Sequence, residues 1–201
     1  MKVLIVGAHP DDYEIGMAGT IKKHTSNRDE VYSIIMSKGG KIGHGEERAK
    51  ESLVSAELLG IKKVFSLDFE DTNIPSGFEA IEKIEKIIKE LRINRIYTHS
   101  IRDVHQDHRN TSRATLAAGR NVKQILFYES PSSDLDFRPT FFVEITDFLD
   151  DKLKVLAAYN SLKKVNKRYF EIEAIKSSAS FRGYQSNVKF AESFEIFRFL
   201  E

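Results

Sequence analysis

Five short apolar segments, separated by longer stretches of helical periodicity, constrain the fold of this chain more than any other feature. The segments are residues 3–6, 30–37, 64–67, 95–99 and 124–128. They are largely apolar rather than alternately apolar and polar, which is typical of parallel strands covered on both faces. The stretches between them predict helices at residues 13–24, 46–59, 78–91 and 109–118. This alternation predicts an α/β fold, a Rossmann-like three-layer αβα sandwich with a mainly parallel sheet.

Beyond Pro131 the alternation becomes less regular. We expect a strand at residues 140–145, a helix at 150–163, and a strand or short helix at 193–200. Four aromatic side chains near the C-terminus have the spacing of core residues, and we expect them to be buried, with an oligomer interface as the alternative: Phe190, Phe194, Phe197 and Phe199. Because no linker, repeat or low-complexity stretch divides the sequence, it predicts a single domain over residues 1–201.

The composition excludes several classes of function. Lys and Arg number 31 against 30 Asp and Glu, so no overall field attracts nucleic acid or an anionic membrane. No apolar run reaches the roughly 18–20 residues that a membrane span needs. The absence of cysteine excludes disulfides, thiolate metal ligands and a cysteine nucleophile. Since the chain enters a strand directly, without a signal-peptide pattern, we expect a cytoplasmic protein.

Two short clusters of histidine and aspartate follow predicted strands. His9-Pro10-Asp11-Asp12 comes after the first strand, and His105-Gln106-Asp107-His108 comes after the fourth. Because parallel strands end at a common edge of the sheet, the two clusters can converge there. Imidazole and carboxylate are ligands for Zn²⁺, and a catalytic zinc site needs three of them. A carboxylate left free beside the metal can take a proton from a metal-activated water, so the sequence predicts a hydrolytic metal site.

Each cluster alone has a simpler interpretation. Asp11 and Asp12 could cap a helix, and a single histidine at the end of a strand is usually a polar surface residue. The combination favours a metal site, but it leaves the chemistry open. A metal-dependent phosphoesterase would use similar clusters. A non-catalytic sugar- or nucleotide-binding module is a third alternative, although Gly7-Ala8-His9-Pro10 lacks the glycine spacing of a dinucleotide-binding turn.

The two clusters and their neighbours resemble the PIG-L/LmbE-like deacetylases. The specific motifs are His9-Pro10-Asp11-Asp12 after Gly7-Ala8, and Asp103-Val104-His105-Gln106-Asp107-His108; weaker matches extend over most of the chain, among them Tyr128-Glu129-Ser130-Pro131. The resemblance implies a zinc-dependent hydrolase of linear amide C–N bonds. Its substrate would be a small N-acetylated amino sugar or N-acetylglucosamine conjugate, hydrolysed to acetate and a free amine. Because members of this family are often oligomeric, the resemblance leaves a homo-oligomer open.

Carried over by position, the resemblance also implies roles for individual residues. One Zn²⁺ per chain would be held by three ligands, His9, Asp12 and His108. Asp11 would be the general base that activates water. His105 would stabilise the oxyanion or assist departure of the amine. Asp107 would orient an imidazole, although capping of a helix is an alternative role for it.

Substrate contacts and specificity are less well defined by the sequence. Arg48 resembles a substrate-contacting position, with a solvated helix charge as the alternative, and Asp71 could grip sugar hydroxyls. Two departures from the family pattern, Tyr13 after the paired aspartates and Gln106 in place of proline, bear on the subfamily and substrate rather than on metal binding. We expect His99 to be an ordinary hydrogen-bonded histidine that is not part of the site.

Overall fold

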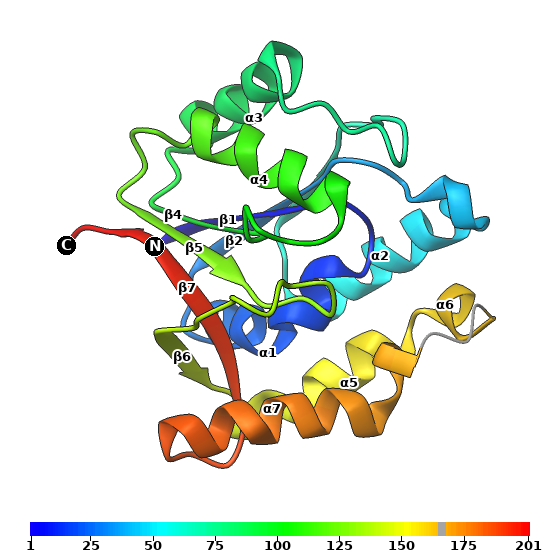
Figure 1. Cartoon of the computed structure of the whole chain (residues 1–201), viewed down its shortest axis with the longest axis vertical. Coiled ribbons are helices and arrows are strands. Elements are labelled where there is room, and N and C mark those ends of the chain that lie inside the picture. Colours follow the sequence, from blue (N-terminus) through cyan, green and yellow to red (C-terminus); the bar gives the residue numbers. More distant parts are fainter. Residues whose placement is uncertain (165–167) are drawn as a thin grey trace.

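The computed structural model describes residues 1–164 and 168–201, and its centre is a seven-stranded sheet (Figure 1). The strands are β1 (Lys2–Gly7), β2 (Glu30–Ile35), β3 (Lys63–Ser66), β4 (Arg95–Thr98), β5 (Gln124–Tyr128), β6 (Phe141–Glu144) and β7 (Ala191–Phe199). Their order across the sheet is β3-β2-β1-β4-β5-β7-β6. The first five in this order run parallel, and β7 is antiparallel to both β5 and β6.

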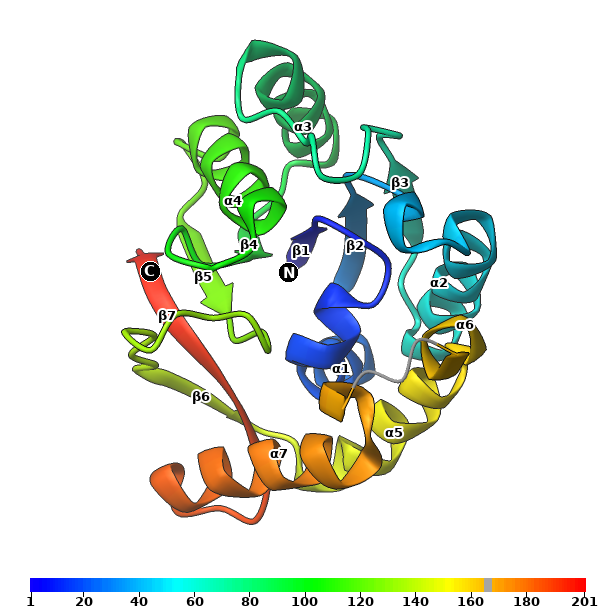
Figure 2. The same ribbon diagram turned by 45° about the vertical axis from the view of Figure 1, so that its right-hand side comes forward.

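Helices cover both faces of the sheet, as Figure 2 shows. They are α1 (Asp12–Ser26), α2 (Gly45–Leu59), α3 (Phe78–Leu91), α4 (Gln106–Ala118), α5 (Leu149–Ala157), α6 (Asn160–Lys164) and α7 (Ile172–Ser186). Leu4 and Val6 of β1 pack toward α3 and α4, whereas Val3 and Ile5 pack toward α1, α2 and α5. The predicted three-layer α/β fold is confirmed. Among the described residues, no helix has both the length and the apolar character needed to cross a membrane.

The prediction is less accurate in the C-terminal third. The helix predicted at residues 150–163 is divided into α5 and α6. Helix α7 was not predicted, because its apolar residues do not form one face: Ile172 and Phe181 are exposed, while Ile175 is buried. The segment predicted as either strand or helix at residues 193–200 is a strand, β7.

Burial of the C-terminal aromatic residues was only partly predicted. Phe194 is fully buried, but Phe197 is 45% exposed and Phe199 is 38% exposed, so the prediction is wrong for these two. Strand β6 pairs with residues 191–194 of β7 and no further. The second half of β7 therefore lies at an edge of the sheet, where its side chains have fewer neighbours.

Close packing of α1 on the sheet depends on Gly16. A Cβ atom at this position would lie 2.6 Å from Cδ2 of Tyr128 and 2.8 Å from the Glu129 carbonyl oxygen. We expect Gly16→Ala to lower the free energy of unfolding by about 1–3 kcal/mol, because this strain exceeds the gain in helix propensity. Urea denaturation would measure the effect. Gly40→Ala is the matched control, since a Cβ there meets nothing within 4 Å, and an equal effect in both variants would contradict the packing argument.

Candidate active site

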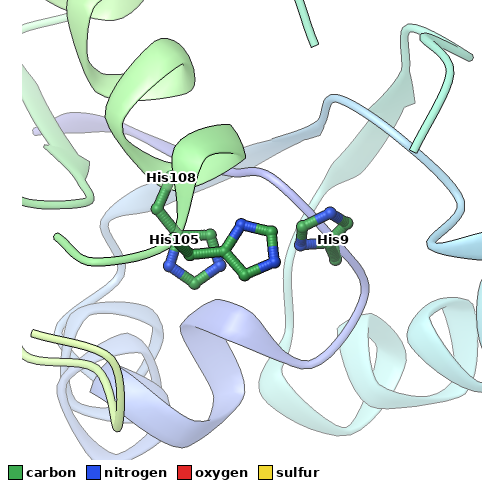
Figure 3. A group of neighbouring side chains, drawn as sticks. All are labelled: His9, His105 and His108. Carbon is green, nitrogen blue, oxygen red and sulfur yellow. The ribbon is translucent and has the colours of Figure 1, made fainter. Parts of the chain in front are cut away.

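The two His/Asp clusters meet at the carboxyl edge of the sheet. Strands β1 and β4 are paired up to Val6 and Thr98, so the loops that follow them leave the sheet side by side. The ring centroid of His9 lies 5.2 Å from that of His105 and 5.7 Å from that of His108 (Figure 3). The predicted convergence of these distant segments is confirmed. The three rings line a cavity of about 280 Å³, which we call the edge cavity.

Two carboxylates orient the imidazole of His9. Its Nε2 lies 3.0 Å from Oδ1 of Asp71 and 3.1 Å from Oδ2 of Asp107. A carboxylate only accepts hydrogen bonds, so Nε2 carries a hydrogen and donates it. Burial disfavours the charged ring, but Asp107 and Asp71 more than offset this and raise the pKa of His9 to about 9. When the ring gives up a proton to bind a metal, Nδ1 is therefore the nitrogen left with a free lone pair.

A third carboxylate orients His108 in the same way. Nδ1 of His108 lies 3.0 Å from Oδ2 of Asp103, which also accepts a hydrogen bond of 2.6 Å from the Ser130 hydroxyl. Burial opposes the charge on His108, yet Asp12 and Asp103 raise its pKa to about 10. The nitrogen available to a metal is Nε2, which lies 3.4 Å from Oδ1 of Asp12.

Asp12 lies between the two available imidazole nitrogens. Its Oδ2 is 3.7 Å from Nδ1 of His9 and accepts a hydrogen bond of 2.7 Å from the His9 backbone N–H. Although burial opposes it, the charge of His108 holds the pKa of Asp12 well below its usual range, so the carboxyl is ionised. The Asp12 carboxylate thus lies close to both imidazoles, with Oδ2 facing His9 and Oδ1 facing His108.

Three sets of described residues place three donor atoms within 4.8 Å of one another: His9/His105/His108, Asp12/His99/His108 and His9/Asp71/Asp107. His9 and His108 each occur in two of these sets. The donor chemistry, nitrogen with carboxylate oxygen and no sulfur, fits Zn²⁺ and other borderline divalent ions. The residues present therefore fit a metal ion. The ligand set predicted from the sequence, His9/Asp12/His108, is not one of these three sets and stays a prediction.

His105 is bound differently from the other two rings of the edge cavity. It caps α4, and its Nδ1 accepts a hydrogen bond of 3.2 Å from the Asp107 backbone N–H. Burial, followed by the charges of His108 and His9, lowers the pKa of His105, so its ring is neutral. A neutral ring with Nδ1 as acceptor carries its hydrogen on Nε2. In this arrangement Nε2 of His105 is a hydrogen-bond donor.

Asp11 is a buried carboxylate next to the metal-binding atoms. Its Oδ1 accepts a hydrogen bond of 2.8 Å from Nη2 of Arg48, and both residues line the edge cavity. Burial raises the pKa of Asp11 to about 6, against the opposing effect of the Arg48 guanidinium. The residue also has a φ of 98°, which non-glycine residues rarely adopt and which often marks functional positions. A carboxyl with a pKa near neutrality is suited to proton transfer.

The two predicted substrate-binding residues also line the edge cavity, but most of their polar atoms have protein partners; the exception is Nε of Arg48, which is buried without a hydrogen-bond partner. Arg48 donates hydrogen bonds to the backbone oxygens of Gly39 and Pro10 as well as to Asp11. Asp71 accepts from His9 and from the backbone N–H of Lys41. Their contact with substrate stays a prediction.

Sequence reasoning missed the role of Asp103 and part of the role of His99. Asp103 belongs to the second motif but was given no function, although its position five residues before His108 was the available signal. His99 is hydrogen-bonded as expected, since its Nε2 accepts from the Ala8 backbone N–H at 3.1 Å. It also lies 3.1 Å from Oδ2 of Asp12 and stacks on His108 with ring centroids 3.8 Å apart. His99 therefore contacts two of the predicted metal ligands, Asp12 and His108.

Comparisons with known proteins agree with this geometry. Uncharacterized deacetylase YaiS of Escherichia coli K12 is 32% identical over 167 residues, which cover 79% of this chain and 90% of the relative. Diacetylchitobiose deacetylase of Thermococcus kodakarensis is 30% identical over 191 residues, covering 80% of this chain and 69% of the relative. The solved N,N'-diacetylchitobiose deacetylase of Pyrococcus horikoshii, in complex with its inhibitor MPG, superposes with a TM-score of 0.85 at 26% identity, over 98% of this chain and 83% of that one.

A family profile also matches the chain. The profile described as "PIG-L: GlcNAc-PI de-N-acetylase" matches residues 4–119, a span that includes both His/Asp clusters and more than half of the chain. The resemblance inferred from the two motifs is confirmed. The chain therefore belongs to the PIG-L family.

Proposed function

We propose that this protein hydrolyses the N-acetyl group of an amino sugar with the help of one Zn²⁺, releasing acetate and a free amine. Its family and its relatives are deacetylases, and it is a hydrolase of this kind. The observation that carries the proposal is the orientation of His9 and His108 by carboxylates. Each ring directs toward Asp12 the nitrogen that would give up its proton to a metal, and the carboxyl of Asp11 lines the same cavity.

We assign the metal to His9 Nδ1, Asp12 and His108 Nε2. A bound Zn²⁺ would act as a Lewis acid and lower the pKa of a water molecule at the site. Asp107, Asp71 and Asp103 would fix the hydrogens on the opposite nitrogens of the two rings and raise the basicity of the ligands.

The remaining residues divide the proton transfers between them. Asp11 accepts the proton of the attacking water. Because burial raises the pKa of this carboxyl to about 6, it can also give the proton up again near neutral pH. His105 donates its Nε2 hydrogen to the oxygen that becomes negative as the acetyl carbon turns tetrahedral. Arg48 holds the Asp11 carboxylate in place through its 2.8 Å hydrogen bond, and one oxygen of that carboxylate is left to the cavity.

The proposal is tested by metal analysis followed by a screen for amine release. We expect about one zinc per chain, and release of acetate and amine from N-acetylated amino sugars that stops on chelation and returns with Zn²⁺. Deacetylation of a disaccharide of two N-acetylglucosamine units, the substrate named for the Thermococcus relative, is the first reaction to assay. Release of phosphate from simple esters, without acetate release from any N-acetyl sugar, would contradict the proposal.

The carboxylate behind His108 gives a more specific prediction. We expect Asp103→Asn to weaken Zn²⁺ binding about 10–100-fold, because the neutral amide lacks the negative charge that stabilises the hydrogen on Nδ1 of His108 and raises the basicity of the ring. Competition with a zinc-binding dye measures the change. Asp136→Asn, at an exposed position, is the control. Equal zinc affinity in the two variants would show that Asp103 does not contribute to zinc binding.

Two other expectations from the sequence belong to the same proposal. We propose that the protein acts in the cytoplasm, a location that is compatible with its net charge of +1 and its lack of cysteine. A homo-oligomer is proposed by analogy with the family, and light scattering of the purified chain measures it directly.

A further inference from the structure

A second cavity of about 440 Å³ lies directly beside the edge cavity. The two share four lining residues, Ile15, Ser130, Pro131 and Tyr169. The outer wall of this second cavity is α7, which Figure 2 shows running beneath the sheet with its first turn near α1. A molecule in the edge cavity therefore has room to continue into the second cavity.

Each of the two cations that line the second cavity is paired with a carboxylate of the protein itself. Arg182 binds both carboxylate oxygens of Glu129, with Nε donating to Oε2 at 2.8 Å. The remaining Nη1 group donates to the side-chain oxygen of Gln185. Lys152 is buried and donates to Oε1 of Glu192 at 2.6 Å. Within the described lining, neither of these cations is free to bind an anion.

One carboxylate that lines the second cavity has no cationic partner among the described residues. Asp134 is exposed, and its carboxylate has no ion pair or hydrogen bond to any described residue. It adds an uncompensated negative charge to a cavity whose cations are already neutralised. The neighbouring hydroxyls of Ser133 and Ser178 can donate or accept.

Apart from Ser130 and Ser193, the rest of the lining is apolar or aromatic. Phe137, Tyr169 and Ile175 provide surface on which the C–H face of a sugar ring can pack. Aromatic and aliphatic surface together with a few hydroxyls and one carboxylate suits a polyhydroxylated, uncharged group.

We infer that the second cavity is a subsite for an uncharged glycosyl group attached to the N-acetylated sugar. Sugar hydroxyls can donate to Asp134 and exchange hydrogen bonds with the serine hydroxyls. A carboxylate or phosphate in the same place would lose its hydration without gaining a free cation, and would face Asp134 at close range. The inference rests on the proposed function, since it takes the edge cavity as the place of the N-acetyl sugar, and it excludes acidic conjugates as preferred substrates.

Two disaccharides that differ in one group test the inference. In both, N-acetylglucosamine is linked through its anomeric carbon to a second ring, which is glucose in one and glucuronate in the other. We expect kcat/KM to be about tenfold or more higher for the glucose compound, and higher than for methyl N-acetylglucosaminide, which has no second ring. Equal values for the two disaccharides, or a preference for the glucuronate, would overturn the inference.

A bulky side chain in the cavity wall provides the structural control. Ser178 is exposed and lines the cavity, whereas its neighbour Ser177 is exposed and does not. We expect Ser178→Trp to lower the ratio of kcat/KM for the glucose disaccharide to that for the methyl glycoside at least about fivefold. Ser177→Trp should keep the wild-type ratio. If both variants lower it equally, or neither does, the second ring does not bind in this cavity.

Failure of the inference can be separated from failure of the proposed function. Isothermal titration of the two deacetylated disaccharides measures the preference for the uncharged ring without turnover. If no N-acetyl glycoside releases acetate but the glucose compound still binds more tightly than the glucuronate compound, the proposed reaction is wrong and the subsite stands. Acetate release without that preference would overturn the subsite alone.

Discussion

Replacing Asp11 with asparagine is expected to lower kcat for deacetylation about 10²–10⁴-fold while the zinc content stays at the wild-type level. Asparagine has nearly the same shape, and its side-chain oxygen can still accept the hydrogen bond from Arg48. It cannot accept a proton from water, however, so the effect falls on the chemical step. Single-turnover acetate release, combined with metal analysis of the same sample, measures both quantities.

The control for this variant is Asp147→Asn, an exposed aspartate remote from both clusters in sequence. It should leave kcat and zinc content unchanged. Turnover of Asp11→Asn close to the wild-type rate would show that another group accepts the proton. Parallel loss of zinc and activity would instead make Asp11 part of the metal centre, and the separation between Asp12 as ligand and Asp11 as base would be wrong.

The second large effect is expected from His108→Ala. This substitution removes one proposed ligand and leaves the carboxylates of Asp12 and Asp103 without their shared partner. We expect zinc affinity to fall by more than the roughly 10–100-fold associated with loss of a supporting carboxylate, and deacetylation to fall with it. Titration with zinc in competition with a chelator measures the affinity.

His44→Ala is the matched control for His108→Ala. His44 is exposed, and its imidazole pairs with Glu47 rather than with the rings of the edge cavity. Its removal should leave zinc affinity unchanged. If His108→Ala bound zinc as tightly as the control, the metal would have to be held by a set of residues without His108, such as His9, Asp71 and Asp107.

The sheet and the position of the site could be predicted from local patterns. The parallel strands β1, β2, β4 and β5 are largely buried apolar runs, and such a run is visible without knowledge of its neighbours; the edge strand β3 is only partly buried. The His/Asp clusters directly follow two of these runs, and the geometry of a parallel sheet brings strand ends together whatever their separation in sequence. The C-terminal third lacked such a signal. Helix α7 has exposed Ile172 and Phe181, and its burial depends on β6, β7 and α5, which come from other parts of the chain.

The sequence by itself determined the fold class, the edge of the sheet that carries the site, and the residue types that meet there. Only the tertiary structure decided which nitrogen of each histidine is free. For His9 that choice depends on partners distant in sequence: Asp71 lies 62 residues from it, and Asp107 lies 98 residues from it, whereas Asp103, the partner of His108, is five residues away. It also decided that Arg182 and Lys152 are neutralised in the second cavity. Side-chain pairing follows from three-dimensional proximity, which a linear pattern of residue types does not contain.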